Sequence, residues 1–421
     1  MRRLFDIRSP SFVWIALALG VAAPDIALYG VMLRYYSFLL CFSLVLNVLF
    51  VRWLVLAEAN DRDLARPGHD GRRLVACWLG AALIVAYTDY SVGALILAQT
   101  VWLAAHGRQL GSRLQPWAAA LAVLAVACLP LLGALRTQVG RDGLHADLSQ
   151  SPVGVALNLL YPLFSYTFGE TILPWHLLVI AAVPLVAVAF AGLPRRVRGR
   201  PLVAFGLLLI ALPIAFNTLI QTTVAADLTF LTMASRTWFV LPIFAILLAF
   251  GIVAMPTRMR WLTVVVLLAA NGAALGNLFM REQFHNPIFA VPLREVEAAV
   301  RSESTAGDVL LADYDIGFQY YWLMQPPAGT EFLRSEDWPA PQGSVEAAQP
   351  AHVWLITYGR DRTRLGDHAD EIRSFLAPRY TLGSERQYVP IDAAYRAVKA
   401  WLLRRDSYAA KLTVQRFDRA H

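Results

Sequence analysis

The strongest constraint on this chain is a series of nine long apolar runs within its first 280 residues. The runs cover residues 12–24, 35–56, 74–87, 91–105, 116–135, 176–193, 202–219, 237–255 and 261–279. A helix that crosses the hydrocarbon core of a bilayer needs about 20 mostly apolar residues. Charged residues make up 16% of the chain, against about 25% in soluble proteins. The sequence therefore predicts a polytopic α-helical membrane protein with about nine transmembrane helices. It excludes a disordered chain, a nucleic-acid-binding scaffold and an ordinary cytosolic enzyme.

Arginine is distributed unevenly between the loops that join these runs. Sixteen arginines lie in one alternate set of loops and four lie in the other, namely Arg34, Arg136, Arg141 and Arg236. Loops rich in Lys and Arg stay on the cytoplasmic side. We therefore expect a multi-pass protein of the cytoplasmic (inner) membrane, with its N-terminus in the cytoplasm. The net charge of +7 then reflects topology, and no nucleic-acid partner is expected.

The chain after the last apolar run is polar and has a different pattern. We expect two domains: residues 1–280, with a long outer loop at 136–174, and an extracytoplasmic α/β domain at 281–421. In this second domain the pattern predicts helices at 292–302, 367–376 and 393–403, strands at 308–312, 352–358 and 380–388, and a loop at 326–350. Within the outer loop, residues 152–166 are aromatic and weakly amphipathic, which is typical of an interfacial or re-entrant segment.

Five charged residues at the outer ends of the predicted spans are the candidates for function: Asp25, Arg34, Asp89, Glu170 and Arg236. Charges at such depths are costly unless they pair, face a water-filled cavity or reach the interface. Two arginines beside carboxylates suit a lipid phosphate together with a general base or a metal ligand. The alternatives are structural: the arginines extend to headgroups, Asp25 caps a helix, and Asp89 closes a turn.

Four outer tyrosines are candidates for a substrate pocket, with an interfacial aromatic belt as the alternative. They are Tyr29, Tyr35, Tyr87 and Tyr90. The three cysteines, Cys41, Cys77 and Cys128, lie in apolar runs, and we interpret them as packing residues. No cofactor is evident; a divalent metal is possible, although no cluster of ligands in the sequence demands one.

Four short patterns give the chain a resemblance to a known superfamily. They are RLF at 3–5 followed by Pro24, Tyr29 and LRYYS at 33–37; AYTDY at 86–90; YTFGET at 166–171 with Pro174 and Trp175; and SR at 235–236 leading to VLP at 240–242. In this order they resemble the GT-C superfamily of polytopic glycosyltransferases, in particular bacterial members related to protein mannosyltransferases and lipid A aminoarabinose transferases. Asp89 stands where many relatives have His.

The resemblance implies transfer of a sugar from a polyprenyl-phosphate donor to an acceptor outside the cytoplasmic membrane. It also implies that Arg34 and Arg236 contact the lipid phosphate, that Asp25, Asp89 or Glu170 is the base, and that the outer tyrosines line the pocket. The family's acidic catalytic loop lies between two spans that would precede Met1, so we expect either that Met1 is an internal start or that the chain is a truncated relative. The alternatives are a transporter or flippase of a lipid-linked substrate, and a non-catalytic membrane subunit that docks a protein partner.

Overall fold

The computed structural model divides the chain into two compact units, residues 1–285 and 286–421. It describes residues 10–30, 36–59, 69–133, 152–193, 201–223, 234, 237–285, 293–312, 322–324, 329–359, 368–388, 397–398, 401 and 411–420. Residues 281–285, which the hydropathy pattern assigned to the polar tail, belong to the first unit.

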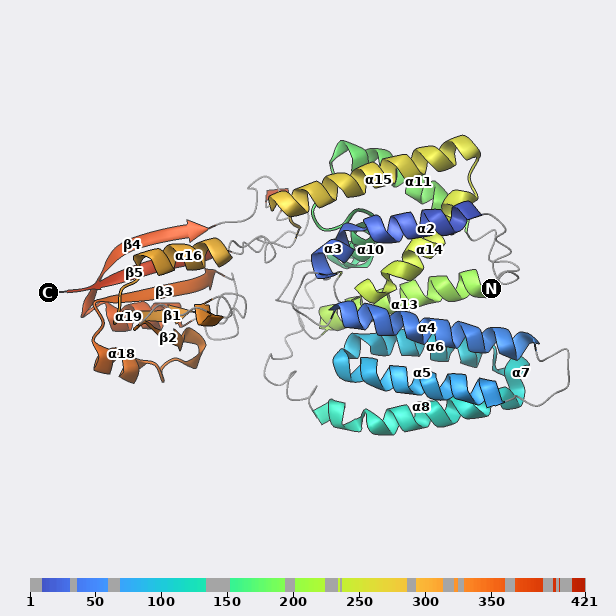
Figure 1. Cartoon of the computed structure of the whole chain (residues 1–421), viewed down its shortest axis with the longest axis horizontal. Helices are drawn as coiled ribbons and strands as arrows, with labels where there is room; N and C mark the ends of the chain where they lie inside the picture. Colours follow the sequence, from blue (N-terminus) through green and yellow to red (C-terminus); the bar gives the residue numbers. More distant parts are fainter. Residues whose placement is uncertain are drawn as a thin grey trace. The chain divides into compact units, whose positions relative to one another are not determined.

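The first unit is a bundle of helices (Figure 1). The helices are α2 (Pro10–Ala22), α3 (Pro24–Gly30), α4 (Tyr36–Ala59), α5 (His69–Thr88), α6 (Gly93–Ala105), α7 (Gly107–Leu110), α8 (Gln115–Ala127), α10 (Pro152–Phe168), α11 (Leu177–Ala191), α13 (Pro201–Thr223), α14 (Leu241–Val253) and α15 (Thr257–Met280), with short 3₁₀ turns η1 (Tyr90–Val92) and η4 (Trp238–Val240). Each of the nine predicted runs overlaps one of these helices. The segment at 152–166, expected in the interface or as a re-entrant segment, forms α10.

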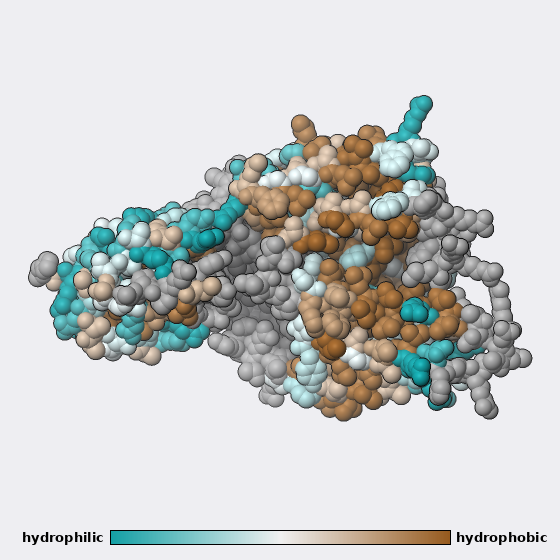
Figure 2. Space-filling view, viewed as in Figure 1, coloured by the Kyte–Doolittle hydropathy of each residue, from teal (hydrophilic) through white to brown (hydrophobic). Residues whose placement is uncertain are grey.

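Within the part of the chain that the structure describes, four helices are long and apolar enough to cross a membrane. They cover Ser37–Ala57, Gly107–Ala127, Pro201–Leu219 and Thr257–Met280. Shorter apolar helices cover Ser11–Ala22, Gly93–Ala105, Leu177–Ala191 and Trp238–Val253. Many large apolar side chains on the bundle are exposed, including Trp14 and Leu177, and apolar surface dominates the bundle in Figure 2. A soluble protein rarely exposes so much apolar surface, so these features indicate a membrane protein.

The helices alternate in direction, so their connections gather at two ends of the bundle (Figure 1). We call one the arginine end; it carries exposed Arg72, Arg73, Arg108 and Arg258. Arg113 Nη1 there donates to the carbonyl oxygen of Ala57 at 2.5 Å. Such bonds satisfy the carbonyl groups that a helix leaves unpaired at its C-terminus. We call the other the acid end; it comprises α3, the turn at 88–92, the loop at 169–176, η4 and residues 281–285.

Three amide and indole side chains form a chain of hydrogen bonds inside the bundle. Trp78 Nε1 on α5 donates to Gln99 Oε1 on α6 at 2.8 Å. Gln99 Nε2 donates in turn to Asn47 Oδ1 on α4 at 3.0 Å. All three side chains are buried. Because buried polar groups need partners, these bonds fix the register of the three helices.

The second unit is a five-stranded sheet with helices on both faces. Its elements are α16 (Leu293–Glu303), β1 (Val309–Ala312), β2 (Glu331–Arg334), α18 (Gln342–Ala348), β3 (His352–Gly359), α19 (Ala369–Leu376), β4 (Tyr380–Tyr388) and β5 (Lys411–Arg419). The strand order is β2-β1-β3-β5-β4. β1 is parallel to both β2 and β3, whereas β5 is antiparallel to β3 and β4. Val296 and Val300 of α16 pack on one face of the sheet; Val345 of α18 and Ile372 of α19 pack on the other.

The predicted loop at 326–350 is wrong, because this segment contains β2 and α18. The sequence pattern did not predict β5. The predicted helix at 393–403 lies outside the described residues except at 397–398 and 401. The remaining strands and helices of this unit occur where the sequence predicted them, within one or two residues.

Candidate functional site

Asp25 is completely buried at the acid end of the bundle. Helix α2 ends at Ala22, and Pro24 begins the short helix α3, so Asp25 lies in the first turn of α3. Proline suits this position because its fixed backbone angle matches a helix start. Ser165 Oγ, from α10, donates a hydrogen bond of 2.6 Å to Asp25 Oδ2 across 140 residues of sequence. This bond fixes one carboxylate oxygen within the packed helices.

Glu170 lies beside Asp25 on the turn that ends α10, and it is also buried. The two carboxylates interact electrostatically. Gly169 makes this approach possible, because its φ is +81°, in a region that favours glycine. A Cβ atom on Gly169 would lie 2.6 Å from Pro24 Cβ. The turn therefore rests directly on the start of α3, and this contact places the two acids together.

The loop that follows Glu170 is held by α15. Thr171 Oγ1 donates to the carbonyl oxygen of Ala274 at 2.6 Å, and Asn277 Nδ2 donates to the carbonyl oxygen of Thr171 at 2.7 Å. His285 Nε2 lies 2.6 Å from the carbonyl oxygen of Ile172. These hydrogen bonds hold the loop beside the acid pair in place, as a preorganised site requires.

A second hydrogen bond links α10 to the segment that carries Arg236. The hydroxyl of Tyr166, the residue after Ser165, donates to Thr237 Oγ1, and both side chains are buried. Arg236 immediately precedes Thr237 in the sequence. Arg236 lies outside the described residues, as do Arg34 and Tyr35.

Asp89 is buried, and the bonds it makes are those of a turn. Its Oδ1 accepts from the backbone N–H of Ser91 at 2.8 Å, and its carbonyl oxygen accepts from the N–H of Val92 at 3.3 Å. This is the geometry with which Asp caps the start of a helical segment. The turn alternative raised for Asp89 therefore has direct support, whereas a role as base does not.

Of the four candidate pocket tyrosines, Tyr87 is the one whose side chain lies in the described part of the structure. Tyr87 is exposed, and its hydroxyl donates to the carbonyl oxygen of Ala127 at 2.6 Å, which joins α5 to α8. Tyr29 lies in α3 and Tyr90 in η1, but their side chains are outside the described part of the structure.

The notion of a divalent metal at the acid end depends on how many ligands lie there. Divalent cations held by proteins generally take several oxygen or nitrogen ligands. The described residues contain no group of three or more His, Cys, Asp or Glu side chains that could hold a metal ion.

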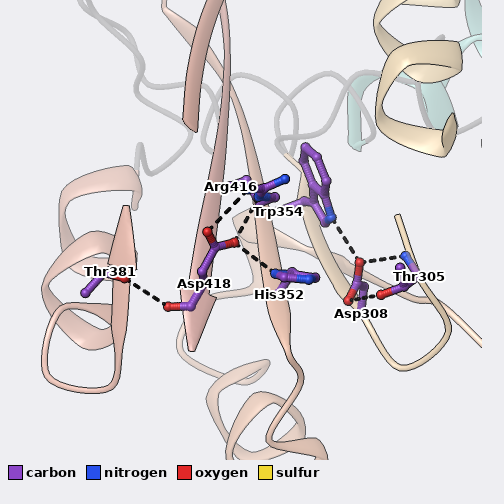
Figure 3. Close-up of polar contacts among 7 residues, drawn as sticks. All are labelled: Thr305, Asp308, His352, Trp354, Thr381, Arg416 and Asp418. Carbon is purple, nitrogen blue, oxygen red and sulfur yellow. Dashed lines mark hydrogen bonds and ion pairs between the residues drawn. The ribbon is translucent and has the colours of Figure 1, made fainter. Parts of the chain in front are cut away.

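The second unit has a polar cluster of its own (Figure 3). Asp418 Oδ1 lies 2.9 Å from His352 Nδ1 and accepts from Arg416 Nε at 2.9 Å. Thr381 Oγ1 donates to the Asp418 carbonyl oxygen at 3.4 Å. Burial alone would raise the pKa of Asp418, but the hydrogen bonds and charges of Arg416 and His352 bring it below its ordinary value. These contacts join β3, β4 and β5, so we interpret the cluster as structural.

A separate buried carboxylate in this unit, Asp308, fixes the start of β1. It accepts from the Thr305 backbone N–H at 2.8 Å and from Trp354 Nε1 at 3.3 Å (Figure 3). Both donors of these hydrogen bonds belong to the sheet or to the turn before β1. The acid end of the bundle is consequently the better candidate for chemistry.

No family model, curated protein or solved structure matches the chain. The argument for function therefore depends on the residues themselves.

The sequence patterns identified both acids but not the residues that support them. Ser165, Tyr166, Thr237 and His285 are ordinary polar residues in or beside apolar segments, and their contacts join segments far apart in the sequence. Gly169 did carry a signal, because a lone glycine between an aromatic helix and an acid indicates a tight turn.

Proposed function

We propose that this chain is a membrane glycosyltransferase of the GT-C type. It transfers a hexosyl or pentosyl group from a polyprenyl-phosphate donor to an acceptor hydroxyl on the outer side of the cytoplasmic membrane. In this proposal the bundle spans the membrane about nine times, with the arginine end in the cytoplasm. The acid end and the second unit then lie outside.

The observation that carries this proposal is the buried acid pair at the end opposite the exposed arginines. Asp25 and Glu170 come from different segments, yet Ser165 and the Gly169 turn bring them together. Pairs of buried acids at the mouth of a membrane bundle are costly and generally mark function. Their exclusion from solvent suits a reaction in which water would otherwise hydrolyse the activated sugar.

The proposed reaction is a single displacement at the anomeric carbon. One carboxylate accepts the proton of the acceptor hydroxyl while that oxygen forms a bond to the anomeric carbon. The bond between that carbon and the phosphate oxygen breaks, and polyprenyl phosphate leaves with the bonding electron pair. Arg236, next in sequence to Thr237, and Arg34 are proposed to bind this phosphate, since guanidinium groups bind phosphate through paired hydrogen bonds. The configuration at the anomeric carbon is inverted.

The test is sugar transfer by the purified full chain. We would reconstitute it in lipid vesicles with radiolabelled undecaprenyl-phosphate hexose and pentose donors and a cell-envelope lipid extract as acceptor. Asp25→Asn and Glu170→Gln keep the shapes of the side chains but remove the base, so at least one should lower turnover by about 10²–10⁴-fold. Asp70→Asn is the matched control, because Asp70 is an exposed acid at the start of α5.

Two results would overturn the proposal. One is full turnover by both acid variants. The other is a wild-type protein that consumes no donor but moves the intact donor across the vesicle membrane, which would establish the transporter alternative.

A further inference from the structure

Residues 281–285 fold back from the end of α15 onto the loop that carries Glu170. This reversal requires two non-glycine residues with positive φ, Arg281 at 60° and Gln283 at 55°. Such conformations are strained and persist where the surrounding contacts hold them in place. Gln283 Oε1 accepts from the Leu173 backbone N–H at 3.4 Å. Backbone strain therefore accompanies the contact between residues 281–285 and this loop.

His285, at the end of this segment, is buried and contacts the loop through both its backbone and its ring. Its backbone N–H donates to the Glu170 carbonyl oxygen at 2.8 Å. Its ring Nε2 lies 2.6 Å from the Ile172 carbonyl oxygen, and its Nδ1 lies 3.3 Å from the Tyr161 hydroxyl. A carbonyl oxygen only accepts hydrogen bonds, so Nε2 carries the proton. In the neutral ring, Nδ1 then accepts from the Tyr161 hydroxyl.

These bonds control the loop on both sides of Thr171. They fix the carbonyl groups of Glu170 and Ile172, so the backbone that carries the Glu170 carboxylate cannot shift without breaking them. The ring also packs against Phe164 of α10, with centroids 5.5 Å apart. Through Tyr161 and Phe164 the loop is tied to the same helix that supplies Ser165 to Asp25. His285 thus connects the positions of both acids.

We propose that His285 is a positioning residue for the acid pair, holding Glu170 at a fixed place beside Asp25. The effect of His285 on turnover rests on the proposed function. Its structural consequence, control of the loop at 169–176, is independent of that function. A shift of about 1 Å in a catalytic group can cost about 10²-fold in rate, so loss of this support should act on turnover and spare donor binding.

The test uses variants that separate the polar role of the ring from its shape. His285→Phe keeps a planar ring but loses both polar atoms. His285→Gln retains an N–H donor that can reach the Ile172 carbonyl. The matched control is His106→Phe at the arginine end, because His106 also contacts a backbone carbonyl and stacks on an aromatic ring, Trp102, with centroids 4.2 Å apart.

Two measurements are made on the full chain in vesicles. Hydrogen–deuterium exchange reports the loop directly: His285→Phe should speed exchange in peptides covering 169–176 by about 10-fold or more, and His106→Phe should leave it unchanged. Sugar transfer reports the acids: His285→Phe should lower kcat by about 10²-fold with an unchanged KM for the donor. His285→Gln should recover most of both losses.

Unchanged exchange at 169–176 in His285→Phe would overturn the inference. Faster exchange with an unchanged kcat would reduce His285 to a structural contact and also refute the positioning role. If the wild-type protein transfers no sugar, the proposed function fails; the exchange measurement then still decides whether His285 controls the loop.

Discussion

Replacing Gly169 by alanine tests the packing that brings the acid pair together. The added Cβ would lie 2.6 Å from Pro24 Cβ and 2.8 Å from Pro24 Cγ, whereas carbon atoms normally approach to about 3.5–4.0 Å. Pro24 has a rigid ring and begins a helix, so it cannot rotate away. Relief of this overlap costs about 1–3 kcal/mol. The φ of +81° adds about 1–2 kcal/mol for any residue with a Cβ. We expect Gly169→Ala to destabilise the bundle by about 2–5 kcal/mol.

The assay is equilibrium unfolding of the full chain in mixed micelles with increasing SDS, followed by far-UV circular dichroism. Gly272→Ala is the control, because Gly272 lies within α15 and a Cβ there meets nothing within 4 Å. That change should be neutral or stabilise by up to about 1 kcal/mol.

Adding Pro24→Gly to Gly169→Ala should recover the stability lost to the steric overlap but not the stability lost to the positive φ. This double variant separates the two costs. The reasoning is refuted if Gly169→Ala unfolds at the same SDS fraction as Gly272→Ala.

Three further predictions concern other parts of the chain. Gln99→Leu removes the acceptor of the Trp78 indole and the donor to Asn47, so we expect a loss of about 1–3 kcal/mol in the same SDS titration. Asp89→Ala removes the bond to the backbone after α5 and should cost about 1 kcal/mol, while Asp89→Asn should retain most of it. The depressed pKa of Asp418 means that its carboxylate stabilises the second unit at any pH above the ordinary pKa of an aspartate. This contribution is lost as the pH falls through the lower pKa of the folded state. Asp418→Asn should flatten that acid dependence, measured by tryptophan fluorescence.

Each of these predictions has a clear contrary outcome. An unaltered midpoint for Gln99→Leu would mean that the buried chain of hydrogen bonds contributes nothing to helix packing. Equal losses in Asp89→Ala and Asp89→Asn would show that the turn does not depend on the side-chain acceptor. An acid dependence that survives in Asp418→Asn would assign it to other carboxylates.

Nine of the bundle helices could be predicted because each overlaps an apolar run, and the hydropathy of a segment is a local property of its sequence. The short helices α3 and α7 match no such run and were not predicted. The contact between Ser165 and Asp25 could not, since it depends on how segments 140 residues apart pack together. For the same reason, residues 281–285 were interpreted as part of the polar tail: their composition is polar, and it is the contacts of Gln283 and His285 with the loop that place them in the bundle.

In the second unit, β5 was not predicted because its alternation of apolar and polar residues is short. The alternation covers Leu412 to Gln415 and breaks at Arg416. Thr413 and Gln415 are nevertheless buried alongside Leu412 and Val414. β2 was not predicted because it has only four residues and is partly exposed. It also lies in a segment rich in proline and glycine, which normally indicates a loop.

The strand order of the second unit has a consequence for how it folds. β5 comes after β4 in the chain but lies between β3 and β4 in the sheet. Among the described strands, β4 has no partner except β5, so its pairing must wait until β5 has emerged. The pairing of β5 with β3 joins segments distant in sequence, which slows folding. If a protease cuts the chain just before Lys411 before β5 has paired, β3 and β4 both keep open edges that are prone to aggregation.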